Sequence, residues 1–214
     1  MHTPGRLIAI EGGEGVGKST QAALLACTIG AVLSREPGGS PIAERIRDLL
    51  LDHSLGTPAP RAELYLMLAA RAEHLSVLIE PALAVGRHVV VDRFVGSTLA
   101  YQGYGRGLPV DEVRRACDLA SGGRWPDLCI LLDIPRDLAE RRRAAQQAQL
   151  PGVSPDRIEA EEPEFHRRVN EGFRTLASDD SGRWVVLDGS APPPQVAAAV
   201  LGAVRARLGI EGFL

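Results

Sequence analysis

The chain has 214 residues, of which 45% are hydrophobic, and a net charge of −3 at pH 7. This length suits a single α/β domain over residues 1–214, and the apolar fraction excludes a disordered chain. The mildly acidic balance gives no reason to expect a nucleic-acid partner, no apolar stretch is long enough to cross a membrane, and three scattered cysteines without metal-binding spacing fit a cytoplasmic protein.

Five short apolar runs are predicted to be strands, at residues 6–10, 31–35, 88–92, 129–133 and 184–188. Because these runs alternate with helical patterns and have few polar positions, they predict a parallel sheet with helices on both faces. The helices are expected at residues 20–28, 42–52, 60–85, 136–148, 156–178 and 194–208. The 60–85 pattern is apolar around much of its circumference, which predicts a mostly buried helix.

A glycine-rich loop joins the first predicted strand to the first predicted helix. Residues 12–19 read GGEGVGKS and match G-x-x-x-x-G-K-[ST], a pattern whose backbone N–H groups turn towards phosphates. In this pattern Lys18 reaches the β- and γ-phosphates and Ser19 holds Mg²⁺. A chance glycine-rich turn is the alternative, but the strand before the loop and the helix after it count against that. The predicted fold is therefore a three-layer α/β fold of the P-loop NTPase type with a five-stranded parallel sheet.

Lys18 is the only lysine in the chain, and every other basic residue apart from the histidines is an arginine. A compact ammonium on a flexible stem suits a phosphate cradle, and a planar guanidinium has a different shape. The predicted binding set for the ATP phosphates is Gly12, Gly13, Glu14, Gly15, Val16, Gly17, Lys18, Ser19 and Thr20.

Three further segments narrow the choice among P-loop proteins. Residues 35–39 read REPGG, residues 92–103 read DRFVGSTLAYQG, and residues 156–159 read DRIE. With the P-loop, these segments resemble the thymidylate kinase family of the bacterial type over nearly the whole chain. The resemblance implies ATP-dependent phosphorylation of dTMP to dTDP, with Mg²⁺ as cofactor and a homodimer as the assembly.

The resemblance also implies a role for each matching residue. Arg93 would grip the acceptor phosphate, with Asp92 and Ser19 near the magnesium ion. Arg71 would read the thymine edge, and Tyr101 would lie under the sugar and disfavour a 2′-hydroxyl. The full set implied for dTMP is Glu14, Arg35, Glu36, Pro37, Met67, Arg71, Arg93, Ser97, Thr98, Tyr101 and Gln102.

Each of these positions also has a structural alternative. Arg35 and Glu36 could form a surface ion pair, since such pairs are common on turns. Asp92 could simply cap the helix after it. Arg71 could be a solvated helix residue and Tyr101 an ordinary core aromatic.

The chain departs from the family pattern at two places. Met67 stands where the family usually has a phenylalanine that stacks on thymine, and a methionine covers a ring more loosely. Gly15 stands where some members have a P-loop arginine, and the other members supply that arginine from a lid. We expect a lid over about residues 142–160, with a loop at 149–155. Its catalytic arginines would be Arg143 and Arg157, chosen from a set that also includes Arg141 and Arg142. A solvated basic helix face is the alternative.

Two other functions remain open at this stage. The nearest is a kinase for another nucleoside monophosphate or for a deoxynucleoside, although the REPGG and STLAYQG segments argue against it. The other is a P-loop nucleotide-binding regulator of the GTPase kind. The chain has no N-K-x-D guanine motif, because its one lysine belongs to the P-loop.

Overall fold

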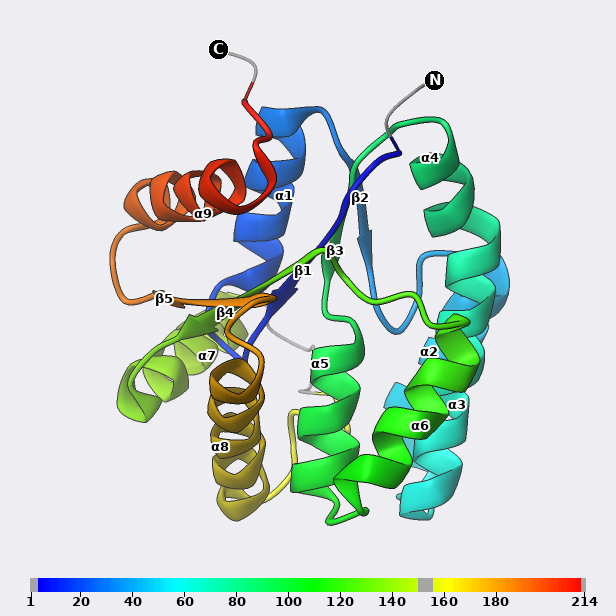
Figure 1. Cartoon of the computed structure of the whole chain (residues 1–214). Coiled ribbons are helices and arrows are strands. Elements are labelled where there is room, and N and C mark those ends of the chain that lie inside the picture. The colour runs from blue at the N-terminus through cyan, green and yellow to red at the C-terminus, as the bar shows by residue number, and fades with distance from the viewer. Residues whose placement is uncertain (1–3, 150–155, 213–214) are drawn as a thin grey trace.

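The computed structural model describes residues 4–149 and 156–212 of the chain. Its centre is a parallel sheet of five strands in the order β2-β3-β1-β4-β5, covered by helices on both faces (Figure 1). The strands are β1 (Leu7–Glu11), β2 (Val32–Arg35), β3 (Val89–Asp92), β4 (Leu128–Asp133) and β5 (Trp184–Asp188). The predicted fold class is confirmed, and every strand bound lies within one residue of its expected position.

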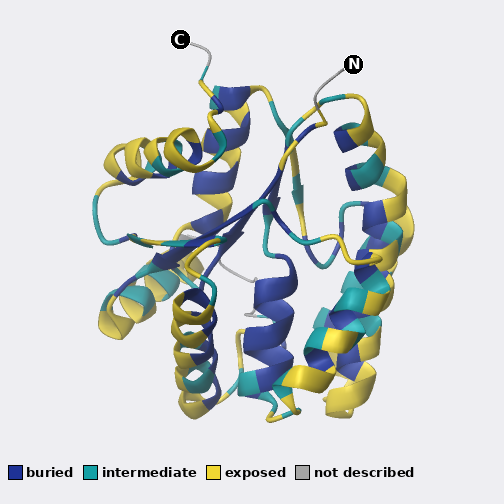
Figure 2. Ribbon diagram, viewed as in Figure 1, coloured by how far each residue is buried: buried dark blue, intermediate teal, exposed yellow. Residues whose placement is uncertain are grey.

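The two faces of the sheet carry separate hydrophobic cores. Because successive side chains of a strand point to opposite faces, Leu7 and Ala9 of β1 belong to one core, while Ile8 and Ile10 belong to the other. The three central strands are buried at nearly every position, whereas the edge strands β2 and β5 alternate with exposed residues. Figure 2 shows this burial along the centre of the sheet.

The helices were predicted less completely than the strands. Their bounds are α1 (Lys18–Ile29), α2 (Pro41–Leu51), α3 (Pro60–His74), α4 (Glu80–Ala84), α5 (Val95–Thr98), α6 (Val110–Ser121), α7 (Arg136–Gln149), α8 (Pro163–Asp179) and α9 (Pro193–Leu208). A short 3₁₀ turn, η1 (His53–Leu55), and two π-helical segments, η2 (Leu75–Ile79) and η3 (Leu99–Gly105), complete them.

Two helix predictions need correction. The 60–85 pattern is helical throughout, but the π-helical segment η2 interrupts it, and α3 is buried on one side only. The predicted helix at 156–178 begins at Pro163, because proline favours the first helical turn. Before it, the Asp156 side chain accepts hydrogen bonds from the N–H groups of Ile158 and Glu159 and holds a turn. The expected loop at 149–155 falls mainly on residues 150–155, outside the described residues.

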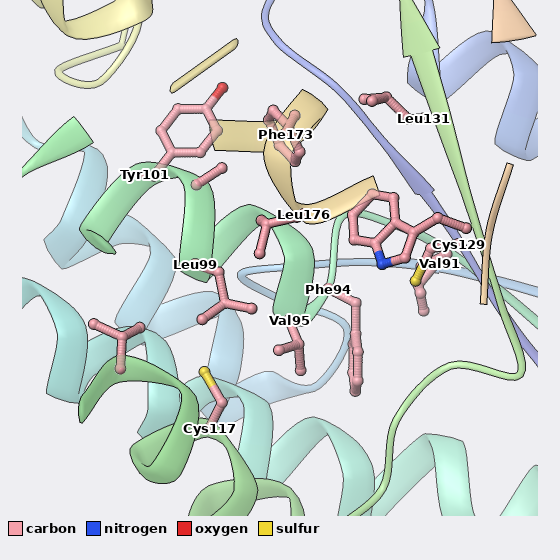
Figure 3. Packing of buried hydrophobic residues seen from close by; sticks show 14 of the residues in the cluster. Val91, Phe94, Val95, Leu99, Tyr101, Cys117, Cys129, Leu131, Phe173 and Leu176 are labelled. Carbon is pink, nitrogen blue, oxygen red and sulfur yellow. The ribbon is translucent and has the colours of Figure 1, made fainter. Parts of the chain in front are cut away.

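The α5–η3 segment is a central helix that sequence reasoning did not predict. Residues 94–103 are all buried, so no polar face gives the segment a helical period. Its side chains pack against α6, α8 and the sheet. Figure 3 shows one such neighbourhood, with Leu99 of η3 near Leu176 of α8. Among the described residues, no helix has both the length and the apolar character needed to cross a membrane.

Candidate active site

The P-loop lies where β1 turns into α1, at the carboxyl edge of the sheet. Gly12 has φ 141° and Gly15 has φ 75°, and L side chains rarely adopt such values. A Cβ atom on Gly12 would lie 2.6 Å from the Leu132 carbonyl oxygen, so only glycine fits there. Lys18 begins α1 and donates from Nζ to the Gly13 carbonyl oxygen at 2.5 Å. The loop, its lysine and the positive end of α1 therefore lie together, which is the arrangement that the sequence predicts for a phosphate cradle.

The neighbouring strand β3 places Asp92 and Arg93 beside this loop. Ile10 of β1 pairs with Asp92, so the two strand ends are adjacent. Asp92 Oδ2 accepts a hydrogen bond from the Ser19 hydroxyl at 2.5 Å. Arg93 adopts φ 71°, which is unusual for a residue with a side chain, and donates to the Gly12 carbonyl oxygen at 2.9 Å.

Charges at this edge are strongly coupled. Arg93 forms an ion pair with Glu14 and lies over the Tyr101 ring, with 4.9 Å from its Cζ atom to the ring centroid. Burial would raise the pKa of Glu14, but the charges of Arg93 and Lys18 outweigh it and lower that pKa to about 2. Burial lowers the pKa of the Lys18 ammonium, and Arg93 lowers it further. An anion bound here would have the opposite effect on Lys18, because an opposite charge stabilises the ammonium.

All eleven residues predicted to bind dTMP line one cavity of about 440 Å³. Lys18, Ser19 and Asp92 line the same cavity, so it reaches the P-loop. Arg35 lines it while pairing with Glu44 at 2.9 Å, and these side chains are 55% and 38% exposed. The surface ion pair considered for Arg35 is thus present, but its carboxylate partner is Glu44.

One end of the cavity holds a buried polar cluster around Arg71. The Arg71 side chain is only 2% exposed, so it is no solvated helix residue. It donates to Glu36 Oε2 from Nε at 2.8 Å and to the Thr98 hydroxyl from Nη2 at 2.8 Å. Its Cζ atom also lies 4.9 Å from the centroid of the Phe94 ring. The guanidinium of Arg71, on α3, therefore joins the REPGG turn to α5.

Another part of the cavity wall comes from η3. Tyr101 donates its hydroxyl proton to Glu14 at 2.6 Å, while its ring packs edge-on against Phe165 and Phe173. Tyr101 is therefore both a core aromatic and a cavity residue. Gln102 also lines the cavity and donates from its side-chain amide to Glu63 at 2.8 Å.

Sequence reasoning missed several residues of the cavity wall. They are Arg47, Leu51, Phe94, Asp156, Ile158 and Glu159. The DRIE segment was noticed for its arginine, yet the structure places its other side chains at the cavity. Arg47 and Leu51 lie on α2, and their helical pattern gave no signal that distinguishes a cavity wall from any other helix face.

The two predicted lid arginines occupy different environments. A Cβ atom on Gly15 would lie 2.9 Å from Cγ of Arg143, so α7 packs directly on the P-loop. Within the described residues, the buried Nε of Arg143 has no hydrogen-bond partner. Arg157 is instead held by the buried Glu63 at 2.8 Å and by the Leu50 carbonyl oxygen at 2.9 Å.

The other two arginines considered for the lid have partners away from the P-loop. Arg141 pairs with Asp137 on the exposed side of α7 at 2.7 Å. Arg142 donates to the carbonyl oxygens of Gly189 and Ser190. Neither arrangement brings a guanidinium to the phosphate cradle, so Arg143 is the arginine of this run that lies beside it.

Comparisons with known proteins identify the family. The family model described as thymidylate kinase matches residues 10–200. The chain belongs to the thymidylate kinase family. A thymidylate kinase from Synechococcus sp. (strain JA-2-3B'a(2-13)) is 45% identical over 94% of this chain and 95% of its own length. Another from Trichlorobacter lovleyi is 43% identical over 95% of this chain and 98% of its own length.

A solved structure of thymidylate kinase from Ehrlichia chaffeensis gives the same result for the fold. It aligns with a TM-score of 0.75 and 30% identity, covering 94% of this chain and 99% of that structure. Membership in the thymidylate kinase family confirms the predicted kinase class, with ATP as phosphate donor and dTMP as acceptor. It favours the kinase over the P-loop regulator.

Proposed function

We propose that dTMP fills the cavity beside the P-loop, with its phosphate at Arg93 and its base at Arg71, and receives the γ-phosphoryl group of ATP to give dTDP. The observation that carries this proposal is the convergence of eleven predicted residues, from four separate segments, on one cavity that reaches Lys18. The P-loop residues 12–20 would hold the ATP phosphates through backbone N–H groups and the start of α1.

Phosphoryl transfer between two nucleotides requires positioned positive charge, and it needs no general base. A phosphomonoester is mostly a dianion at neutral pH, so its oxygen is already a competent nucleophile. The obstacle is bringing two polyanions together, and positioned cations remove it. Lys18 and Arg93 supply two such cations at the junction of donor and acceptor. When dTMP binds, its phosphate would share Arg93 with Glu14.

Base and sugar recognition follow from the two cavity ends. Thymine presents O4 as an acceptor, and a guanidinium only donates, so Arg71 suits thymine and not the amino edge of cytosine. At the other end, Tyr101 and Glu14 close the space below the sugar through their hydrogen bond. This closure would leave little room for a 2′-hydroxyl, and Glu14 would meet the 3′-hydroxyl.

Residues at the P-loop also fit a magnesium ion. Asp92 Oδ1 is buried without a hydrogen-bond partner among the described residues, while Oδ2 accepts from the Ser19 hydroxyl. Such oxygen atoms are the ligands that Mg²⁺ prefers. Asp92 and Ser19 would therefore hold the ion, directly or through water. When bound, Mg²⁺ supplies charge neutralisation to the triphosphate.

Replacing Asp92 by asparagine tests this magnesium site. The substitution keeps the shape and the Ser19 contact but removes the carboxylate charge. We expect the Mg²⁺ concentration for half-maximal activity to rise by about 10–100-fold, the usual cost of losing such support. Activity titrations with MgCl₂ at saturating ATP would measure it. A variant with the wild-type Mg²⁺ requirement would contradict the assignment and leave the helix-cap alternative.

Replacing Met67 by phenylalanine tests the base end of the cavity. Met67 lines the cavity and is partly buried against the core. An aromatic ring there should lower KM for dTMP several-fold, since stacking contributes about 0.5–1.5 kcal/mol beyond area burial. KM for ATP should not change. An unchanged or higher KM for dTMP in a folded variant would mean that another side chain already covers the base.

An acceptor panel assayed with ATP and Mg²⁺ tests the function as a whole. We expect ADP formation to depend on dTMP. The other acceptors should have lower kcat/KM, namely dUMP, dCMP, dAMP, dGMP, the ribonucleotide of thymine and thymidine. A different preferred monophosphate or nucleoside would support the alternative kinase. Hydrolysis of ATP or GTP that ignores every acceptor would support the regulator.

The assembly and location are finer proposals. The segment α3–η2 exposes Tyr65 and Val77, and α6, which packs on α3, exposes 87% of Leu119. This exposed apolar surface supports the predicted homodimer, because large apolar side chains at a surface often mark an interface. The mass of the protein in solution would test it. The cytoplasmic location stays a prediction.

A further inference from the structure

A buried histidine joins the REPGG turn to Arg71 in the cavity wall. His74 is the last residue of α3 and is 0% exposed. Its Nδ1 lies 3.1 Å from Glu36 Oε1, and its Nε2 lies 2.7 Å from the Ser34 hydroxyl. An ionised carboxylate has no proton to give, so Nδ1–H donates to Glu36. In the neutral ring, Nε2 then accepts the proton of Ser34.

The same carboxylate holds Arg71 with its other oxygen. Glu36 Oε2 lies 2.8 Å from Nε and 2.7 Å from Nη2 of Arg71. His74 and Arg71 are three residues apart on α3, so they meet the carboxylate from one helix face. With both oxygens engaged, Glu36 cannot rotate without losing a buried hydrogen bond. The direction of the Arg71 guanidinium is therefore coupled to the ring of His74.

The turn is shaped to close over this ring. Gly39 has φ 86°, and a Cβ atom there would lie 2.5 Å from Cδ2 of His74 and 2.6 Å from Oγ of Ser34. A side chain at position 39 would therefore push the turn off the histidine. The contact extends from β2 through the ring to Arg71. His74, Glu36 and Arg71 are buried, and Ser34 is partly buried.

We propose that His74 is a positioning residue for base recognition, which fixes Glu36 and thereby aims the Arg71 donors at the acceptor edge of thymine. This inference rests on the proposed function, in which Arg71 reads the base. Orientation matters more in this chain because Met67 replaces the aromatic residue that would otherwise hold the ring plane. A misdirected guanidinium would then lose its preference for the O4 of thymine over the amino group of cytosine.

Selectivity distinguishes this role from that of an ordinary core histidine. A core residue would affect stability and leave the ratio of kcat/KM for dTMP to kcat/KM for dCMP unchanged. A positioning residue would lower that ratio through KM for dTMP, while KM for ATP stays the same. The ratio is also insensitive to the fraction of active enzyme, so partial unfolding cannot imitate the effect.

Two amide substitutions distinguish the contribution of Nδ1 from that of Nε2. In His74→Asn the side-chain amide replaces Nδ1 and keeps the bond to Glu36, whereas in His74→Gln it replaces Nε2 and keeps the bond to Ser34. His74→Leu removes both bonds. His88→Leu is the matched control, because His88 accepts a hydrogen bond from the Arg6 N–H at the opposite edge of the sheet.

We expect the dTMP-to-dCMP ratio to fall by about 10–100-fold in His74→Gln and His74→Leu, the range for losing a hydrogen bond to a charged group. His74→Asn and His88→Leu should stay within a few-fold of the wild type. Equal ratios in His74→Asn and His74→Gln would overturn the inference, and this comparison holds even if His74→Leu does not fold. If the wild type itself lacks a preference for dTMP over dCMP, the proposed function fails at Arg71 independently of His74.

Discussion

Replacing Lys18 by alanine should lower kcat by about 10²–10³-fold, the usual cost of removing one positioned donor from a charged transition state. Lys18 is buried at the start of α1 and lines the proposed dTMP cavity. No other lysine in the chain can take its place. The measurement is single-turnover transfer from ATP to dTMP, which separates the chemical step from product release.

Lys18→Arg should fail as well, although it keeps the charge. The ammonium is confined against the Gly13 carbonyl oxygen at 2.5 Å, and a planar guanidinium does not fit the same space. Arg6→Ala serves as a control, because Arg6 pairs with Asp127 at the far edge of the sheet and should not affect turnover. Near wild-type turnover in Lys18→Arg would refute the phosphate-cradle geometry, provided that both variants melt as the wild type does.

The strands and the P-loop were predictable because local sequence determines them. Runs such as VVVD at residues 89–92 need burial on both faces, which specifies a central parallel strand. The glycines of the P-loop are needed for local backbone geometry, and Lys18 follows directly in the motif. The α5–η3 segment was not predictable in the same way. Its helix is buried all around, and Gly96, Gly103 and Gly105 lower its helix propensity.

The polar clusters lay beyond sequence reasoning because their members are far apart in the chain. No motif of the sequence includes His74, and the role proposed for it depends on contacts that form only when β2 and the turn after it bring Ser34 and Glu36 against α3. Arg157 and Arg143 likewise looked equivalent as lid arginines. Only the fold shows that one meets the carboxylate of Glu63, 94 residues away, while the other meets the P-loop.

The predicted lid arginines should therefore respond differently to the same substitution. We infer that Arg143 supplies the third cation of phosphoryl transfer, because Gly15 has no side chain and lets α7 approach the P-loop. Arg143→Ala should lower kcat by at least about 100-fold, below the 10³–10⁵-fold contribution of arginine fingers in other P-loop enzymes. ATP affinity should barely change, since the contact matters mainly in the transition state.

Arg157→Ala should instead lower the free energy of unfolding. The Arg157 side chain is 5% exposed and its partner Glu63 is 0% exposed, so the change breaks a buried ion pair. Such a break costs about 3–5 kcal/mol, although Arg106 and Gln102 would still contact Glu63 and bring the loss towards the lower figure. Urea unfolding measures this effect, and single-turnover transfer by the folded fraction should stay close to that of the wild type.

Measured together, the two variants decide which arginine serves the reaction. A large kcat loss in Arg157→Ala with unchanged stability, and none in Arg143→Ala, would reverse the assignment. If both variants transfer at the wild-type rate, the lid mechanism is wrong and the basic run of α7 is a solvated face. The compensating charge would then have to come from Arg35 or Arg106. Arg106 is already shared between Glu63 and Glu161. Arg35 lines the proposed dTMP cavity, and its one ion pair among the described residues is with the half-exposed Glu44, so Arg35 would be substituted next.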